Sequence, residues 1–385
     1  MITKLTAEKL WNGTSLLDHP VVVIEDGRIA SISTLAAGEA PANGHVIDYP
    51  GATLAPAFFD VHCHGGAGHD SMEATPEALN AIGSLLASHG TGSYLATTIT
   101  APLDATLRAL SGLAKLLAAP PAEKQARPLG IHLEGPFLSH AKRGVHPAES
   151  LLAPDIAVFD RLLEAAEGWV RLMTLAPELP GALELAKHAT ARGVRITMGH
   201  SIATAAETRA MIDAGGVSAT HTFNAMRPLD HREPGILGTV LTNDAVFADL
   251  ICDGMHTSEE MVKLWWRAKG PERAILITDS ITATGMPDGE YDLGGMAIHV
   301  VNGRATANGV LAGSVLTQDR ALANFVRFTG ATVAQGLRLL TGNPAAMMGL
   351  GDRVGSLAAG QAADLVAVDG TGKLVAAMHG GQLVN

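Results

Sequence analysis

Two histidines spaced two residues apart, His62 and His64, are the residues of this sequence best suited to chelate a metal ion. They follow the apolar run 52–59, which is typical of a buried strand. Residues two apart in an extended strand point to the same side, so both imidazoles project together from the strand end. An isolated pair favours two exposed loop histidines instead, because short motifs often occur by chance. Further ligands elsewhere in the chain are needed to predict a metal site.

Such residues follow four other apolar runs of the sequence. Taken alone, each is more simply a buried histidine bonded to a backbone carbonyl or an aspartate that caps a helix. In a (β/α)8 barrel, however, the carboxyl ends of the strands converge on one mouth, where active sites lie. Ligand type and placement together therefore predict a metal site at that mouth. The residues and the runs before them are Glu134 after 129–133, His200 after 194–199, His221 after 217–220 and Asp279 after 274–278.

The elements that must position these residues alternate between short apolar runs and helix-like stretches, the pattern of βα units around a parallel sheet. Both ends of the chain instead show hairpins, at 21–32 around Asp26-Gly27 and at 363–378 around 369–372. We therefore predict the α/β class: a (β/α)8 TIM barrel over 55–354, with a small β-sandwich domain formed by 1–54 and 355–385. The predicted helices are 76–89, 104–118, 155–166, 181–192, 203–214, 258–268 and 317–328.

The composition is that of an ordinary globular protein, with 385 residues of which 47% are hydrophobic and 17% charged. A formal net charge of −11 and the lack of a basic run argue against nucleic-acid binding. No apolar stretch reaches the roughly 18 residues of a membrane span, and the N-terminus lacks a secretory apolar core. We expect no membrane association and a cytoplasmic location, in which Cys63 and Cys252 are free thiols.

Longer motifs that surround these residues resemble those of the N-acetylglucosamine-6-phosphate deacetylases, a family of the amidohydrolase superfamily, over essentially the whole chain. The LEGPF motif within 130–147 and the HTFNAM motif within 220–235 are the most specific to this family. The stretch 343–366, by contrast, is shared by many amidohydrolases. The matching stretches are 60–66, 130–147, 197–201, 220–235, 252–256, 277–291, 311–319 and 343–366.

The resemblance implies that Glu134, His200 and His221 bind a divalent metal ion, most simply Zn²⁺, with Fe, Mn and Co as alternatives. Some members of the family replace the first two histidines with amides and use one metal. This chain keeps His62 and His64, so a second ion bridged through Glu134 is equally compatible. Asp279 matches the family's proton shuttle, which acts as general base and then as general acid.

The same resemblance implies a phosphorylated N-acetyl amino sugar as substrate. Arg232 corresponds to an arginine that reaches the phosphate from the neighbouring subunit, which implies a homodimer. An ion pair between Arg232 and Glu233 is the structural alternative. The other substrate-binding positions carried over are His146 against the acetamide, Asn224 and Ala225, His256 near the sugar or its phosphate, and Leu311 with Ala312.

Three classes of function remain open at this point. The first is hydrolysis of N-acetylglucosamine 6-phosphate to glucosamine 6-phosphate and acetate, with the N-acetylgalactosamine 6-phosphate epimer as a close alternative. The second is an amidohydrolase for a cyclic amide or an N-acyl amino acid, which would not need Arg232. The third is a non-catalytic binding protein on the same scaffold, which should have lost some ligands. All of the expected ligands and Asp279 are present, which favours an enzyme.

Overall fold

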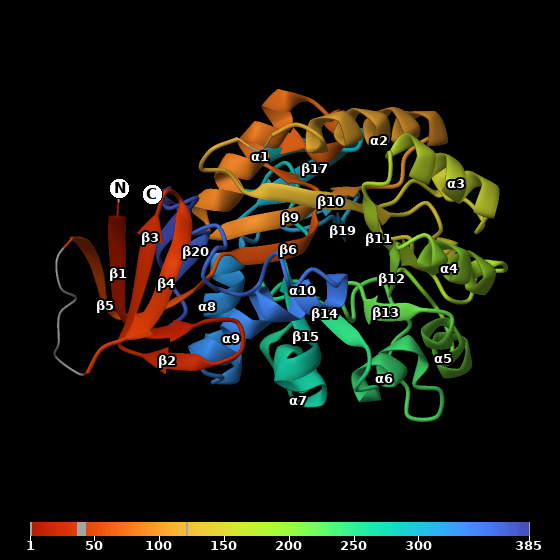
Figure 1. Cartoon of the computed structure of the whole chain (residues 1–385). Helices are drawn as coiled ribbons and strands as arrows, with labels where there is room; N and C mark the ends of the chain where they lie inside the picture. The colour runs from red at the N-terminus through yellow and green to blue at the C-terminus, as the bar shows by residue number, and fades with distance from the viewer. Residues whose placement is uncertain (1, 37–43, 121, 385) are drawn as a thin grey trace.

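The computed structural model describes residues 2–36, 44–120 and 122–384. Residue 121, and residues 1, 37–43 and 385 of the predicted small domain, lie outside the described residues. In Figure 1, a barrel ringed by helices lies beside a sheet that holds both chain ends. The predicted α/β class, a (β/α)8 barrel with a separate β domain from both termini, is confirmed. The exact domain boundaries at residues 54 and 355 stay a prediction.

The barrel is built, within the described residues, from eight strands that pair in parallel in the order β15-β14-β13-β12-β11-β10-β9-β6. The ring closes between β6 and β15, where Cys63 of β6 forms a parallel bridge with Ser280, just beyond the end of β15. The carboxyl ends of all these strands therefore open on the same mouth. The strands are β6 (Phe58–Cys63), β9 (Thr91–Thr98), β10 (Arg127–Glu134), β11 (Val170–Leu175), β12 (Arg195–Met198), β13 (Gly216–Ala219), β14 (Phe247–Ile251) and β15 (Ala274–Ile277).

Helices follow the barrel strands and form its outer layer (Figure 1). The seven helices predicted from the sequence are confirmed within one to two residues at their starts, whereas α6, α9 and α10 were not predicted. Gly270, with φ of 63°, interrupts α7 beyond the predicted end of that helix. The helices are α1 (Pro76–Ser88), α2 (Leu103–Leu117), α3 (Ile156–Ala165), α4 (Ala182–Ala191), α5 (Ala205–Asp213), α6 (Gly235–Thr242), α7 (Glu259–Arg273), α8 (Gln318–Thr329), α9 (Val333–Leu340) and α10 (Gly342–Met348).

A second sheet joins the two ends of the chain. Both predicted hairpins are present, and β5 connects them because it pairs with β1 on one side and with β20 on the other. The apolar run 52–59 is divided between two sheets, since β5 ends at Pro56 and β6 begins at Phe58. The strands are β1 (Ile2–Trp11), β2 (Leu16–Asp18), β3 (Pro20–Glu25), β4 (Arg28–Thr34), β5 (His45–Pro56), β20 (Leu365–Val368), β21 (Leu374–His379) and β22 (Gln382–Leu383).

A four-stranded antiparallel sheet between β15 and α8 was not predicted. It has its own small core, which includes Leu293 and Ile298 and reaches Ile281 just beyond β15. The insertion therefore sits against the carboxyl end of the barrel. Its strands are β16 (Gly289–Leu293), β17 (Met296–Val301), β18 (Arg304–Ala307) and β19 (Val310–Leu311); short elements elsewhere are β7 (Gly65–Gly66), β8 (His69–Asp70) and the 3-10 turns Ser71–Glu73, His140–Lys142 and Ala148–Ser150.

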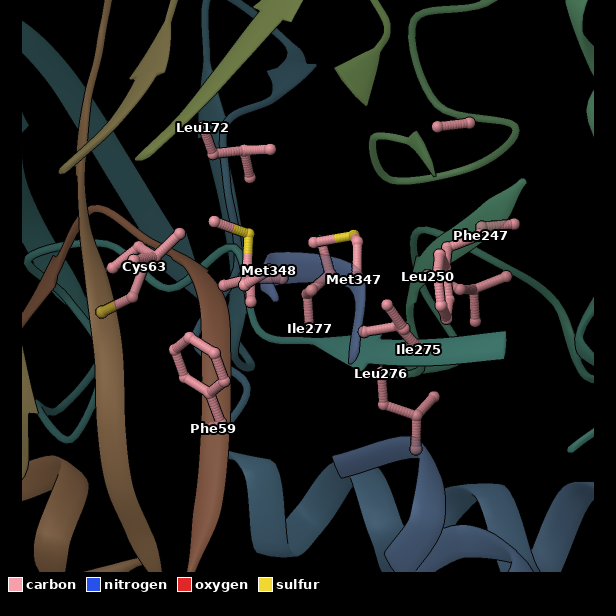
Figure 2. Close-up of a cluster of buried hydrophobic side chains, with 14 of the residues drawn as sticks. Phe59, Cys63, Leu172, Phe247, Leu250, Ile275, Leu276, Ile277, Met347 and Met348 are labelled. Carbon is pink, nitrogen blue, oxygen red and sulfur yellow. The ribbon is translucent and has the colours of Figure 1, made fainter. Parts of the chain in front are cut away.

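The main hydrophobic core fills the space between the barrel strands and the helices. Figure 2 shows part of it, where Phe59 and Cys63 of β6 lie near Ile277 of β15 and Met348 of α10. α10 contacts both β6 and β15, so burial of its methionines stabilises the closure of the ring. Among the described residues, no helix combines the length and the apolar character needed to cross a bilayer.

Candidate metal centre and substrate pocket

Six side chains that are far apart in the sequence meet at the mouth of the barrel. Their ligand atoms form two groups of three. Within each group, all of the ligand atoms lie within 4.8 Å of one another. All six residues are buried. The sequence prediction that strand-end residues converge is therefore matched by the geometry. The first group is His62, His64 and Asp279, and the second is Glu134, His200 and His221.

Glu134 lies between the two groups. Its Oε1 is 3.1 Å from His221 Nε2 and 3.3 Å from His200 Nε2, whereas its Oε2 is 3.1 Å from His64 Nε2. In the first group, Asp279 Oδ1 lies 3.3 Å from His64 Nε2. One carboxylate thus faces histidines from both groups, which is the arrangement that a ligand shared by two ions requires.

The donor set fits a borderline divalent cation. Four imidazole nitrogens and two carboxylates face one another, and imidazole with carboxylate is the ligand mixture that Zn²⁺ and related ions prefer. Burial of these polar and charged groups in nonpolar surroundings is unfavourable unless each group has a partner. The cluster thus has the chemistry of a metal centre.

Electrostatics within the cluster oppose the effect of burial. Burial would lower the pKa of His64, but Asp279 and Glu134 raise it to about 10. Burial would raise the pKa of Asp279, whereas the electrostatic interaction with His62 and the hydrogen bond to His64 lower it to about 2. The carboxylates are therefore ionised, and the cluster attracts positive charge. A divalent cation would compete with the proton of His64, because a histidine ligand must be neutral.

Strained backbone turns direct several of these side chains inward. His200, His221 and Asp279 have φ of 48°, 32° and 52°, values that residues other than glycine rarely adopt. Such outliers gather at functional sites because the surrounding structure imposes them. The N–H of Asp279 donates to the carbonyl of His62 at 3.0 Å, which joins the two ends of the barrel sheet at this point.

Two buried aspartates that the sequence did not single out hold the ligand-bearing strands. Asp249 on β14 accepts a hydrogen bond from the backbone N–H of His221, and burial raises the pKa of Asp249 to about 7. Asp60 on β6 accepts a hydrogen bond at 2.6 Å from the hydroxyl of Thr278, the residue immediately before Asp279. A charged residue inside an apolar strand, as in 247–251, is the signal that could have identified Asp249.

A cavity of about 390 Å³ opens directly onto the cluster. It is lined by five of the seven predicted substrate-binding residues: His146, Asn224, Ala225, His256 and Leu311. His146 also approaches the cluster, with Nε2 at 3.5 Å from Glu134 Oε2. The pocket thus combines a metal centre with convergent polar groups, the usual composition of an active site.

The other two predicted substrate residues do not line this cavity. Ala312, which follows Leu311 in the sequence, is fully buried. Arg232 is exposed on the loop before α6. The backbone N–H of Arg232 donates to Asp230, and no ion pair between Arg232 and Glu233 is present among the described residues. The structure therefore does not bring Arg232 to the pocket of its own chain.

Several pocket-lining residues were missed by the sequence analysis. Lys142 comes from the turn after β10, and its carbonyl accepts a hydrogen bond from His200 Nδ1 at 2.8 Å if that nitrogen carries the proton. Leu293 and Val310 come from the inserted sheet, which forms one apolar wall. Local patterns cannot assign such residues, because their role depends on how the insertion folds back over the mouth.

A larger cavity of about 660 Å³ lies elsewhere, between the amino ends of barrel strands and the small sheet. Arg127, Trp169 and Arg353 line it, and none of the six cluster residues does. Volume would favour this cavity, but the chemistry favours the smaller one. In barrels of this kind the amino-terminal face contributes to stability and the carboxyl-terminal face to catalysis.

A (β/α)8 barrel with a histidine and carboxylate cluster at its mouth defines the class of metal-dependent barrel hydrolases. The model of the amidohydrolase family matches residues 53–384, and the chain belongs to this family. The match includes the six cluster residues and the pocket.

The chain is also similar to individual proteins along 90% or more of its length. It is 38% identical to an N-acetylgalactosamine-6-phosphate deacetylase of Escherichia coli O157:H7, over 95% of this chain and 94% of that protein. It is 38% identical to an N-acetylglucosamine-6-phosphate deacetylase of Lysinibacillus sphaericus, over 90% and 89% of the two chains. The crystal structure of N-acetyl-D-glucosamine-6-phosphate deacetylase from Mycobacterium smegmatis superimposes with a TM-score of 0.92, at 36% identity and with full coverage of both chains.

Proposed function

We propose that this protein hydrolyses the acetamide of N-acetyl-D-glucosamine 6-phosphate to D-glucosamine 6-phosphate and acetate, in amino-sugar metabolism. The observation that carries the proposal is the cluster of four histidines and two carboxylates at the floor of a cavity of about 390 Å³. Relatives that act on phosphorylated N-acetyl amino sugars support the substrate class. A cytoplasmic location stays a prediction.

We further propose that the cluster binds one or two Zn²⁺ ions per subunit, with Fe, Mn or Co as alternatives. Glu134, His200 and His221 would hold one ion, and His62 and His64 would hold a second that shares Glu134. When bound, such an ion acts as a Lewis acid on the acetyl oxygen and lowers the pKa of water. The short distances from Glu134 to both histidine groups support a shared ligand.

Asp279 is the residue to which we assign proton transfer. Its carboxylate lies in the pocket lining beside His62 and His64 and is ionised, so it can accept a proton from the attacking water. It then donates that proton to the departing amine nitrogen, since hydrolysis of an amide needs a protonated leaving group. His146, across the pocket and buried, is placed to hydrogen-bond the acetamide carbonyl.

The phosphate end of the substrate requires cationic or N–H donors. Asn224, Ala225 and His256 line the pocket and can supply polar contacts to the sugar and its phosphate. Asp253 Oδ2 accepts a hydrogen bond from His256 Nδ1 at 2.7 Å, and this bond orients the His256 ring. Arg232 is exposed and does not line its own pocket, so we propose that its guanidinium serves the active site of a second subunit in a homodimer.

Deacetylation of N-acetylgalactosamine 6-phosphate is the second candidate function. The similarity to the Escherichia coli O157:H7 enzyme favours it specifically, because that relative matches at 38% identity over nearly the whole chain. A cyclic amide or an N-acyl amino acid as substrate has no comparable support, and a non-catalytic binding protein would not need the complete ligand set.

A side-by-side assay of the two N-acetylated 6-phosphates, with metal analysis of the purified protein, tests the proposal. We expect acetate release from at least one of the two sugars and close to one or two metal ions per subunit. An N-acyl amino acid and a cyclic amide serve as negative controls. Turnover of neither sugar phosphate by the metal-loaded protein would refute the proposed function.

A further inference from the structure

A layer of five fully buried polar side chains crosses the barrel interior next to the metal cluster. These residues come from consecutive strands, and each is 0% exposed. The interior of such a barrel is ordinarily filled by Val, Ile and Leu, so a polar layer is unusual. We refer to this set as the polar layer: Thr97 on β9, His132 on β10, Thr174 on β11, Thr197 on β12 and Thr220 just after β13.

The polar layer is one continuous chain of hydrogen bonds. His132 Nδ1 lies 3.3 Å from Thr97 Oγ1, and His132 Nε2 lies 2.8 Å from Thr174 Oγ1. Thr174 continues to Thr220 at 3.3 Å, and Thr220 to Thr197 at 2.9 Å. Both tautomers of a neutral His132 satisfy this chain, because a neutral imidazole has one donor and one acceptor.

The layer is attached to the strands that carry the proposed metal ligands. His132 precedes Glu134 by two positions on β10 and therefore shares its face of the strand. Thr220 directly precedes His221. Thr97 Oγ1 accepts the backbone N–H of Cys63 at 2.9 Å, between His62 and His64. One hydrogen-bonded frame thus connects both halves of the cluster.

Three of the four histidine rings in the cluster lack the usual orienting bond. A histidine that binds a metal generally donates its second ring nitrogen to a carboxylate or a carbonyl. Among the residues the structure describes, Nδ1 of His62, His64 and His221 is buried without any hydrogen-bond partner. The ring of His62 instead meets His132 edge to face, with centroids 4.7 Å apart and planes at 87°. For His62, packing against His132 takes the place of that hydrogen bond.

We propose that His132 is a positioning residue, which holds His62 and Glu134 in their metal-binding geometry through the polar layer. The proposal rests on the metal site proposed above. Loss of His132 would let the His62 ring rotate and would leave Thr97 and Thr174 without a shared partner. Because outer partners of this kind typically change metal affinity by 10- to 100-fold, we expect an effect of about that size.

The test is a Zn²⁺ titration of the metal-free, full-length protein in competition with a chromogenic chelator. His132→Leu introduces an apolar side chain of similar bulk and removes both hydrogen bonds, and we expect Zn²⁺ binding about 10- to 100-fold weaker than in the wild type. His132→Gln can restore the bond to Thr174 and should recover most of the affinity. Thr174→Val, an isosteric change, gives a second variant if His132→Leu fails to fold.

The control is Thr91→Val, which removes a buried hydrogen bond from Thr91 to Gln318 at the opposite end of the same strand as Thr97. We expect this variant to lose thermal stability without losing Zn²⁺ affinity. Wild-type affinity in Thr174→Val, and in His132→Leu where that variant folds, would overturn the positioning role, as would an equal loss of affinity in Thr91→Val. A wild-type protein that binds no Zn²⁺ would instead refute the metal site and, with it, this inference.

Discussion

Replacement of Asp279 by asparagine separates proton transfer from metal binding and folding. Asp279 has φ of 52°, a conformation that asparagine adopts more readily than most residues, so the strained turn should persist. Asparagine also keeps Oδ1, which lies 3.4 Å from His62 Nε2 and 3.3 Å from His64 Nε2. What it lacks is the ionised carboxylate that can carry a proton, so the change removes one chemical capacity at nearly constant shape.

The expected loss follows from the size of general acid–base assistance. Proton transfer by a positioned side chain contributes about 10²- to 10⁴-fold, which corresponds to about 2.7 to 5.4 kcal/mol in the activation barrier. We expect kcat of Asp279→Asn for N-acetylglucosamine 6-phosphate to fall by at least about a hundredfold. Acetate release gives kcat and KM, and metal analysis of the same preparation gives the metal content, which we expect to be unchanged.

Asp369→Asn is the matched control, because Asp369 lies in the β20–β21 turn and, within the described part of the chain, its hydrogen bonds stay inside that turn, as where its carboxylate accepts from Thr371 Oγ1 at 2.7 Å. We expect this control to retain wild-type kcat. Activity of Asp279→Asn within about tenfold of the wild type, with full metal content, would refute the proton-transfer role. Such a loss of activity is smaller than the rate assistance that a general acid–base group provides.

Three further predictions address the metal, the phosphate and the scaffold. Exhaustive chelation should abolish turnover, and Zn²⁺ should restore it; full activity in metal-free protein would contradict the metal centre. Arg232→Ala should raise KM for the phosphorylated sugar far more than for its unphosphorylated counterpart, and equal effects in steady-state assays would count against a phosphate role. Lys269→Met should lower the free energy of unfolding by about 2 kcal/mol in denaturant titrations, because Lys269 Nζ donates to the carbonyls of Val240 and Asn243 at 2.9 and 2.7 Å. Burial lowers the pKa of Lys269 from 10.5 to about 8. Between about pH 8 and pH 10.5 the unfolded state therefore binds more protons than the folded state. The stability of the wild type relative to Lys269→Met should then rise with pH in this range.

Local patterns in the sequence were sufficient for much of the fold. The Asp26-Gly27 turn predicts the β3–β4 hairpin because its backbone suits a tight turn between paired strands. Helix starts were also legible, as at Thr75, whose side chain accepts a hydrogen bond from the N–H of Ala78. The inserted sheet at 289–311 was not predicted, because its short strands lie between two elements of the barrel repeat.

The sequence by itself determined which side chains end each strand, since a residue's place relative to an apolar run is a local property. Only the tertiary structure decided that Glu134 stands between two histidine groups and that Arg232 lies outside its own pocket. It also decided that His132 faces His62 within a polar layer. These contacts join strands far apart along the chain, and their distances depend on how the barrel closes between β6 and β15, a geometry that no local pattern encodes.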